Sequence, residues 1–78
     1  MKSYSFAVVI EKEPEDPGYF AYSPTLAGCV SSGDTVEETR ANMREALQQH
    51  VETLLEDGLP IPQDNIFYVE ELALGVPA

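Results

Sequence analysis

The sequence predicts an α+β fold in the order β-β-β-α-β, with one long helix on one face of the sheet. Two observations carry this prediction. Residues 4–10 alternate larger apolar side chains with smaller ones, the two-residue period of a half-buried strand. Residues 36–57 contain no glycine or proline, and a helix of that length measures about 33 Å. Such a helix is long enough to cross a small sheet.

Three strands are expected before the helix. The first ends at residues 13–18, where two prolines and a glycine indicate a chain reversal. The second is expected at residues 19–23, which are rich in aromatic side chains. Residues 24–28 then lead to a short third strand at 29–32. The strands precede the helix without any linker or internal repeat, so we expect residues 1–78 to form a single domain.

The ends of the helix are also marked. Thr35 and Glu38 fit a capping box, and Gly58 supplies a left-handed stop. A fourth strand is expected at residues 66–72, which are β-branched and aromatic in character. If it lies parallel to the first strand, the connection is a right-handed crossover. The predicted helix face toward the sheet consists of Val36, Met43, Leu47, His50 and Leu54, flanked by Ala46 and Val51.

Length and charge narrow the class of protein. A domain of 78 residues has a thin core and often gains stability by association. Four basic and 14 acidic residues give a net charge of −10, which repels nucleic acid and anionic membranes and attracts a basic partner. No signal-peptide pattern and no apolar run of membrane-spanning length occur, so the chain is predicted to be cytoplasmic.

We predict no catalytic site, no metal site and no cofactor. Two-metal hydrolysis needs carboxylates that converge from different strands, whereas the acidic residues here gather around one turn. A solvated turn is the simpler interpretation, with a weak calcium or magnesium site as the alternative. The acidic residues of this turn are Glu11, Glu13, Glu15 and Asp16.

Two other residues invite a chemical interpretation. His50 falls in the apolar helix stripe and is predicted to be a core or interface histidine, with a protonation switch left open. Cys29 has no second cysteine to form an intrachain disulfide and is predicted to be a small buried residue.

One helix can cover only one face of the sheet. We expect Phe6, Val8, Phe20 and Tyr22 to face the helix. The opposite face would then be partly apolar, and we expect it, or the strand edges, to mediate homodimerisation. The alternative is that the rest of the chain covers it. The residues expected on this second face are Ala7, Val9, Tyr19 and Ala21.

A series of turn, cap and packing positions carries a resemblance to a known family. They are Ile10-Glu11-Lys12, Gly18-Tyr19, Ser23-Pro24, Leu26-Ala27-Gly28-Cys29, Gly33-Asp34-Thr35 with Glu37-Glu38, and Leu54-Leu55-Glu56-Asp57-Gly58 leading to Pro60-Ile61-Pro62. In their order and spacing, over residues 4–62, the chain resembles the HicB-like antitoxin family. These positions specify a fold rather than a reaction.

The resemblance implies a partial ribonuclease-H-like sheet with strand order 3-2-1-4 and a homodimer or higher homo-oligomer. It also implies an antitoxin that neutralises a small basic HicA-type toxin, which cleaves messenger RNA, by covering its RNA-binding and active surface. On charge, the acidic turn supplies the candidate contacts. Relatives often carry a C-terminal DNA-binding module that is not expected here, so no direct nucleic-acid contact is predicted. The alternative is an oligomeric structural or small-ligand-binding domain of the same family without a toxin.

Overall fold

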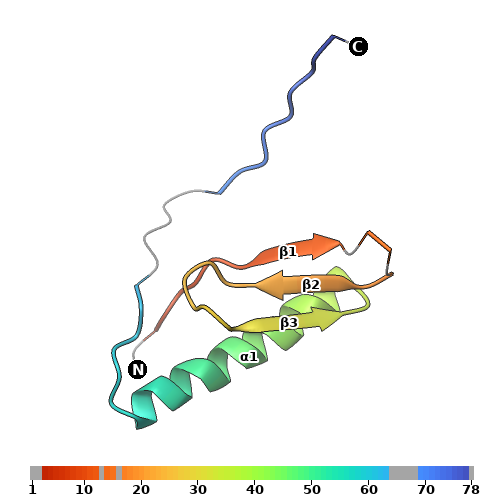
Figure 1. Ribbon diagram of the computed structural model, residues 1–78. Helices are drawn as coiled ribbons and strands as arrows, with labels where there is room; N and C mark the ends of the chain where they lie inside the picture. The colour runs from red at the N-terminus through yellow and green to blue at the C-terminus, as the bar shows by residue number, and fades with distance from the viewer. Residues whose placement is uncertain (1–2, 13, 16, 64–68, 78) are drawn as a thin grey trace.

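The computed structural model describes residues 3–12, 14–15, 17–63 and 69–77. It contains strands β1 (Val9–Lys12), β2 (Tyr19–Tyr22) and β3 (Val30–Gly33), followed by helix α1 (Val36–Glu56). The strands form an antiparallel sheet in the order β1-β2-β3, and α1 lies across one face of it (Figure 1). The predicted α+β class and the order of these four elements are therefore confirmed.

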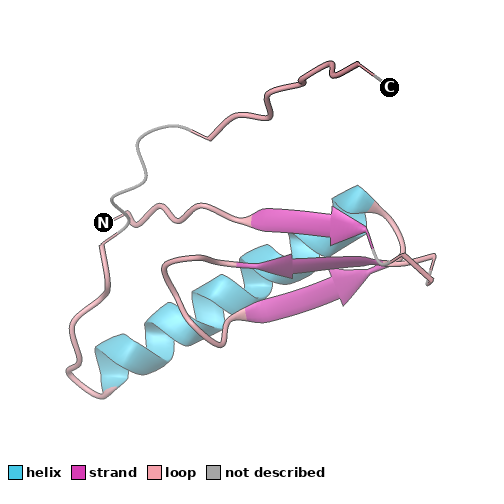
Figure 2. Ribbon diagram, turned by 45° about the horizontal axis from the view of Figure 1, so that its top comes forward, coloured by secondary structure: helices cyan, strands magenta, loops and turns pink. Residues whose placement is uncertain are grey.

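The first strand is shorter than predicted. Residues 4–8 precede β1 and are not in a strand. The reason is that β2 ends at Tyr22, where the chain turns toward β3 (Figure 2). Phe6 and Val8 nevertheless pack against the core. The period-two pattern of this segment thus reflects packing beside the helix rather than strand pairing.

The predicted fourth strand falls partly outside the described residues, since 64–68 are not among them. Residues 69–77 are described and are not in a strand. They extend away from the sheet and helix (Figure 1). The strand order 3-2-1-4 and the ribonuclease-H-like sheet remain predictions, of which the described sheet contains the 3-2-1 part.

The register of the sheet corrects the predicted facing of β2. Ala21 pairs with Ile10 and Ser31, and it is completely buried in the core. Side chains alternate along a strand, so Tyr19 shares the helix side with Ala21. Phe20 and Tyr22 therefore point to the opposite face, and the prediction that they face the helix was wrong.

The short distance between α1 and the sheet explains this inversion. A Cβ atom at Gly33 would lie 2.8 Å from the backbone nitrogen of Thr39 and 2.8 Å from its Oγ1. The next helix-side positions on β3 and β2 are Ser31 and Ala21, both small. An aromatic ring at these positions would push the helix away. The space beneath α1 therefore selects small side chains at these positions, so Phe20 and Tyr22 take the other face, while Tyr19 lies on the helix side at the end of β2, beside Lys12.

The core is small and is closed largely by the helix. Its buried members are Ala21, Leu26, Cys29 and Met43, against which Phe6, Val8, Ile10, Ala46, Leu47, Val51 and Leu54 pack. Most of the predicted helix stripe is thus confirmed. Val36 is an exception, being 39 % exposed. Thr39 is completely buried and was not predicted, and its hydroxyl donates to Thr35 O at 2.7 Å.

The predicted helix ends are confirmed by their hydrogen bonds. Thr35 Oγ1 accepts from Glu38 N at 3.0 Å, as an N-cap requires. The Glu38 carboxylate accepts from Asp34 N at 3.4 Å, one residue earlier than in a standard capping box. At the other end Gly58 is left-handed, with φ +69. Gly58 N donates to Leu55 O and Leu59 N to Leu54 O, the pattern of a Schellman motif.

Cys29 is 4 % exposed and belongs to the core, as predicted. Burial raises the pKa of its thiol, because the thiolate would lose its hydration. The folded chain therefore favours the protonated thiol, which is a weaker nucleophile than the thiolate.

We predict that Gly33→Ala destabilises the fold. The added methyl group meets a backbone atom of α1, so the helix must shift, at a cost of about 1–3 kcal/mol. Urea unfolding followed by far-UV circular dichroism measures the loss. Gly75→Ala is the matched control, since nothing lies within 4 Å of its added Cβ, and its effect should stay below about 0.5 kcal/mol. Equal stability of the two variants would contradict the close approach.

We also predict a pH dependence that belongs to Cys29. A raised pKa in the folded state contributes stability that is fully present below the pKa of the unfolded thiol and is lost as pH rises through the raised value. Cys29→Ala removes this contribution. Urea midpoints measured in a non-thiol reductant at pH 7 and pH 10 should show the advantage of the wild type shrinking at the higher pH. A difference that stays constant would exclude the effect.

Candidate partner-binding surfaces

The face of the sheet opposite α1 is the first candidate surface. The strand register places Val9, Tyr22 and Val30 side by side on it, and Glu11, Phe20 and Ser32 in the adjacent row. We call these six residues the open sheet face. Val30 is 50 % exposed, and the Phe20 and Tyr22 rings are half-buried with their centroids 6.0 Å apart. No helix of the described chain covers this face (Figure 2).

The composition of the open sheet face is that of a binding surface. Two aromatic rings on a rigid strand offer a large contact area at a small cost in side-chain entropy. Glu11 is exposed and is the cross-strand neighbour of Phe20. A carboxylate thus stands at the border of the apolar centre, which resembles the apolar core and polar rim of protein interfaces.

The acidic turn lies at the end of the β1–β2 hairpin. Glu11 and Glu15 are exposed there, while Glu13 and Asp16 lie outside the described residues. Lys12 Nζ donates to Pro17 O at 2.7 Å and lies 4.9 Å from the centroid of the Tyr19 ring. Lys12 therefore links the turn to the helix side of the sheet. The side chains of Glu11 and Glu15 remain exposed to solvent. Their role as partner contacts stays a prediction.

The residues predicted for the oligomer face do not share one surface. Val9 lies on the open sheet face as expected. Ala21 is completely buried and cannot touch a partner, and Tyr19 lies on the helix side beside Lys12. Ala7 is half-buried and precedes β1. Of the four predicted residues only Val9 lies on the open sheet face, and homodimerisation through a sheet face or through the strand edges remains a prediction.

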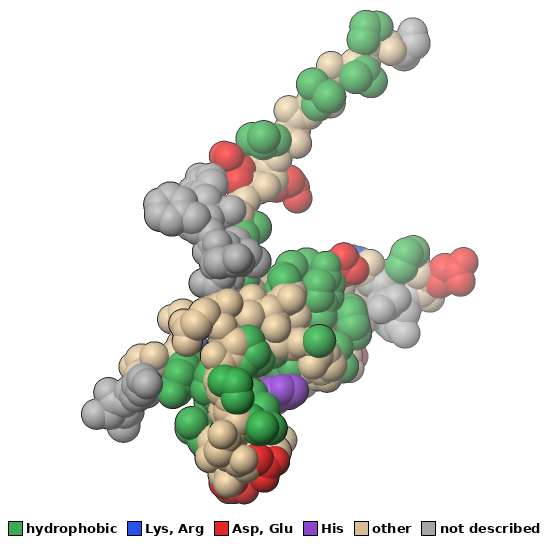
Figure 3. All heavy atoms as spheres, turned by 60° about the vertical axis from the view of Figure 1, so that its left-hand side comes forward, with side chains coloured by type: hydrophobic (Ala, Val, Ile, Leu, Met, Phe, Trp, Pro, Cys, Tyr) green, Lys and Arg blue, Asp and Glu red, His purple; other side chains and the backbone are tan. Residues whose placement is uncertain are grey.

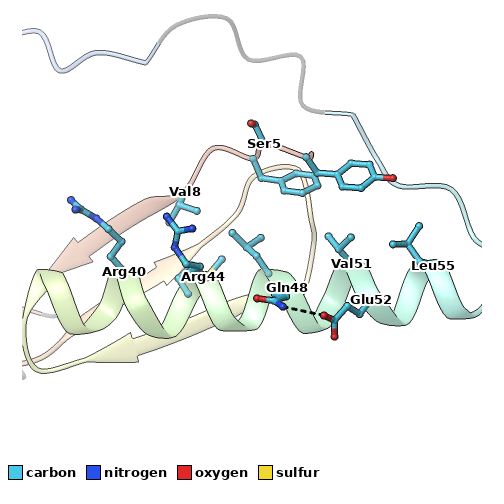
Figure 4. Close-up of a pocket in the computed structure, with 12 residues that line it drawn as sticks. Ser5, Val8, Arg40, Arg44, Gln48, Val51, Glu52 and Leu55 are labelled. Atoms are coloured by element: carbon cyan, nitrogen blue, oxygen red, sulfur yellow. Dashed lines mark hydrogen bonds between the residues drawn. The ribbon is translucent and has the colours of Figure 1, made fainter. Parts of the chain in front are cut away.

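A groove of about 670 Å³ forms the second candidate surface. The segment of residues 4–8 borders one side of it and α1 borders the other (Figure 4). Two rows of the helix line it, each with four-residue spacing. The apolar row is Met43, Leu47, Val51 and Leu55, and the polar row is Arg40, Arg44, Gln48 and Glu52.

The polar row changes its charge along the groove. Arg40 and Arg44 stand at one end, and Glu52 stands at the other, where its Oε1 accepts from Gln48 Nε2 at 3.1 Å (Figure 4). The groove was not predicted from the sequence, because its lining residues match no motif. The four-residue repeat of both rows was the available signal.

Among the described residues, no group of three or more histidine, cysteine, aspartate or glutamate side chains is arranged to hold a metal ion. His50 is half-buried and reaches the surface among hydrophobic side chains (Figure 3). Its assignment as a core or interface histidine remains a prediction. Within the part of the chain that the structure describes, no helix has the length and apolar character needed to cross a membrane.

Comparison with known proteins places this geometry in a family. Residues 6–73 match the HicB-like antitoxin of bacterial toxin–antitoxin systems. The chain is 41 % identical over 63 residues to a UPF0150 protein of Synechocystis sp., covering 81 % of this chain and 78 % of that protein. It is 37 % identical over 60 residues to a UPF0150 protein of Thermoplasma acidophilum, covering 77 % of this chain and 86 % of that protein.

A phage protein is also similar. An uncharacterized 14.9 kDa protein of Haemophilus phage HP1 is 38 % identical over 60 residues, which cover 77 % of this chain but only 44 % of the phage protein. The family match includes all three strands and α1. The chain therefore belongs to the HicB-like antitoxin family of bacterial toxin–antitoxin systems.

Proposed function

We propose that this protein is an antitoxin that binds and neutralises a small basic toxin of the HicA type, which cleaves messenger RNA. Membership of the HicB-like antitoxin family supports a toxin partner. The observation that carries the proposal is the open sheet face, an apolar aromatic surface bordered by Glu11 and the acidic turn.

Charge supports a basic partner. The chain has a net charge of −10, and Glu11 and Glu15 lie exposed at one end of the sheet. A protein that binds RNA needs a basic surface to meet the phosphates. An acidic protein is attracted to that same surface, and long-range attraction speeds their encounter. Occupation of the basic surface then excludes RNA, which gives inhibition without any reaction in this chain.

The aromatic side chains of Phe20 and Tyr22 provide binding affinity that surface charge alone does not provide. Surface ion pairs contribute little to affinity, whereas buried aromatic anchors dominate most protein interfaces. Phe20 and Tyr22 are held side by side on β2, the central strand, so they are already in place before a partner binds. In this proposal the rings provide affinity, and the acidic border provides orientation and speed.

The first prediction concerns the partner itself. Co-purification of the chain with the products of its flanking genes should capture a small basic protein in a stoichiometric complex. The affinity should fall as salt rises, because salt screens the attraction between opposite charges. Titration calorimetry at several salt concentrations measures this. Recovery of a homo-oligomer alone would favour the family domain without a toxin.

The second prediction concerns the surface. Phe20→Ala and Tyr22→Ala should each weaken binding of that partner by about 10- to 100-fold, the range of a hot-spot truncation. Glu11→Lys should mainly slow association and reduce its salt dependence. Glu37→Lys is the matched control, since Glu37 is an exposed carboxylate in the first turn of α1, away from the open sheet face. Surface plasmon resonance separates the two rates. Equal effects of Glu11→Lys and Glu37→Lys would argue against a defined contact.

A further inference from the structure

We propose that the open sheet face is an arginine subsite, which holds an arginine side chain of the basic partner with its guanidinium group between the Phe20 ring and the Glu11 carboxylate. The inference rests on the proposed function for the source of this arginine, and it adds the kind of side chain that the surface recognises. The distribution of apolar and polar residues over the two rows of the face carries it.

The two rows of the open sheet face differ in polarity. The row of Tyr22 is apolar, because both of its cross-strand neighbours are valines. The row of Phe20 is mixed, because the ring lies between the side chains of Glu11 and Ser32. Successive residues on one face of a strand are about 6.6 Å apart, so the apolar row directly adjoins the mixed one.

An arginine side chain contains the same two parts. Its methylene stem is apolar, and its guanidinium group is planar, charged and rich in hydrogen-bond donors. A stem that packs on the Tyr22 row therefore brings the guanidinium group to the row of Phe20 and Glu11. Both parts of the side chain then meet a surface of matching chemistry.

Phe20 and Glu11 can contact one guanidinium group at the same time. They are direct cross-strand partners on one face, and the Cβ atoms of such a pair are about 5 Å apart. A cation is attracted to an aromatic ring within about 6 Å of the ring centroid, and a carboxylate accepts two parallel hydrogen bonds from a guanidinium group. The Tyr22 ring lies 6.0 Å from the Phe20 ring, with 33° between their planes, and it extends the aromatic surface under the stem.

The cation of this subsite has to come from outside the described part of the chain. Every lysine and arginine that the structure describes lies on the helix side of the sheet. Lys12 donates to Pro17 O and lies beside the Tyr19 ring, while the two arginines line the groove beside α1. Glu11 is exposed on the opposite face. The charge that complements Glu11 is therefore supplied by a basic partner.

The subsite distinguishes arginine from lysine. The lysine ammonium is a compact and strongly hydrated charge, whereas the guanidinium group is weakly hydrated, stacks on aromatic rings and matches both carboxylate oxygens. The two side chains carry the same charge, so the long-range attraction to a chain of net charge −10 is equal for both. A preference for arginine consequently reports the short-range contacts at this face.

Titration with two small probes tests the subsite without a partner protein. The probes are N-acetyl-arginine methylamide and N-acetyl-lysine methylamide, followed by amide NMR spectra at constant ionic strength. The arginine probe should bind about two- to fivefold more tightly than the lysine probe and should shift the amide signals of Glu11, Phe20 and Tyr22. Equal affinity for the two probes, or shifts confined to other residues, would overturn the proposal.

Two variants each remove one contact. Phe20→Leu keeps an apolar side chain but removes the ring, and Glu11→Gln keeps the size of the side chain but removes its charge. In each variant the arginine probe should lose its advantage over the lysine probe. Glu37→Gln is the matched control and should retain the advantage, since Glu37 is an exposed carboxylate in the first turn of α1.

Urea unfolding followed by circular dichroism establishes that the variants fold. Glu11 is exposed, so Glu11→Gln keeps the test decisive even if Phe20→Leu is unstable. A folded Glu11→Gln variant with the full preference for arginine would contradict the subsite.

The complex with the captured basic partner separates this inference from the proposed function. Each surface arginine of the partner is replaced by lysine in turn, which leaves the charge of the partner unchanged. One replacement should weaken binding about tenfold, mainly through faster dissociation, and this loss should be absent when the chain carries Glu11→Gln.

The two ideas then fail in different ways. A partner that binds tightly and tolerates every replacement would refute the arginine subsite and leave the proposed function intact. A chain that prefers the arginine probe but captures no basic protein would refute the proposed toxin partner and leave the subsite intact.

Discussion

The close packing of α1 on β2 and β3 is the constraint on which the rest of the structure depends. Gly33 has no side chain, and the backbone of Thr39 occupies the place where one would begin. Ala21 fills the next position and is completely buried. A thin core of this kind has few large side chains to stabilise it, so it gains density by bringing backbones together. The buried hydroxyl of Thr39 is satisfied within its own helix.

Both candidate surfaces follow from this packing. Because the helix side of β2 admits only a small residue at position 21, Phe20 and Tyr22 occupy the open sheet face. Because α1 lies toward β3, it leaves a groove beside the segment that precedes β1. One surface is aromatic with an acidic border, and the other is apolar with a charge gradient. The one helix and three short strands of the described residues thus present two chemically different surfaces to their surroundings.

Much of the local structure could be predicted from the sequence. The helix ends were marked by Thr35 and Gly58, because capping depends on single residues and their immediate neighbours. The facing of β2 was not predictable in the same way. Aromatic residues usually favour the core, and the two-residue period allows either face. Which face each side chain of β2 takes depends on the close contact between Gly33 and Thr39, and this contact forms only when the helix packs on the sheet.

The groove is a second feature that could not be predicted from the sequence. Each of its helical rows repeats every four residues in the sequence. The repeat alone does not predict a groove, because a groove also needs a second wall, which residues 4–8 provide in the folded chain. Residues 4–8 were predicted to belong to the first strand, so no groove was expected between them and the helix. The family resemblance could be recognised from the sequence because the residues that carry it are mostly turn, cap and packing positions, which are local features.

The order of contacts along the chain has a consequence for how this protein forms. Each strand pairs with its neighbour in sequence, and α1 packs on the strands that immediately precede it. Structures built from such near contacts form quickly, since little loop entropy opposes them. The segment 69–77 takes no part in these contacts. The sheet and α1 can therefore form without any contribution from residues 69–77.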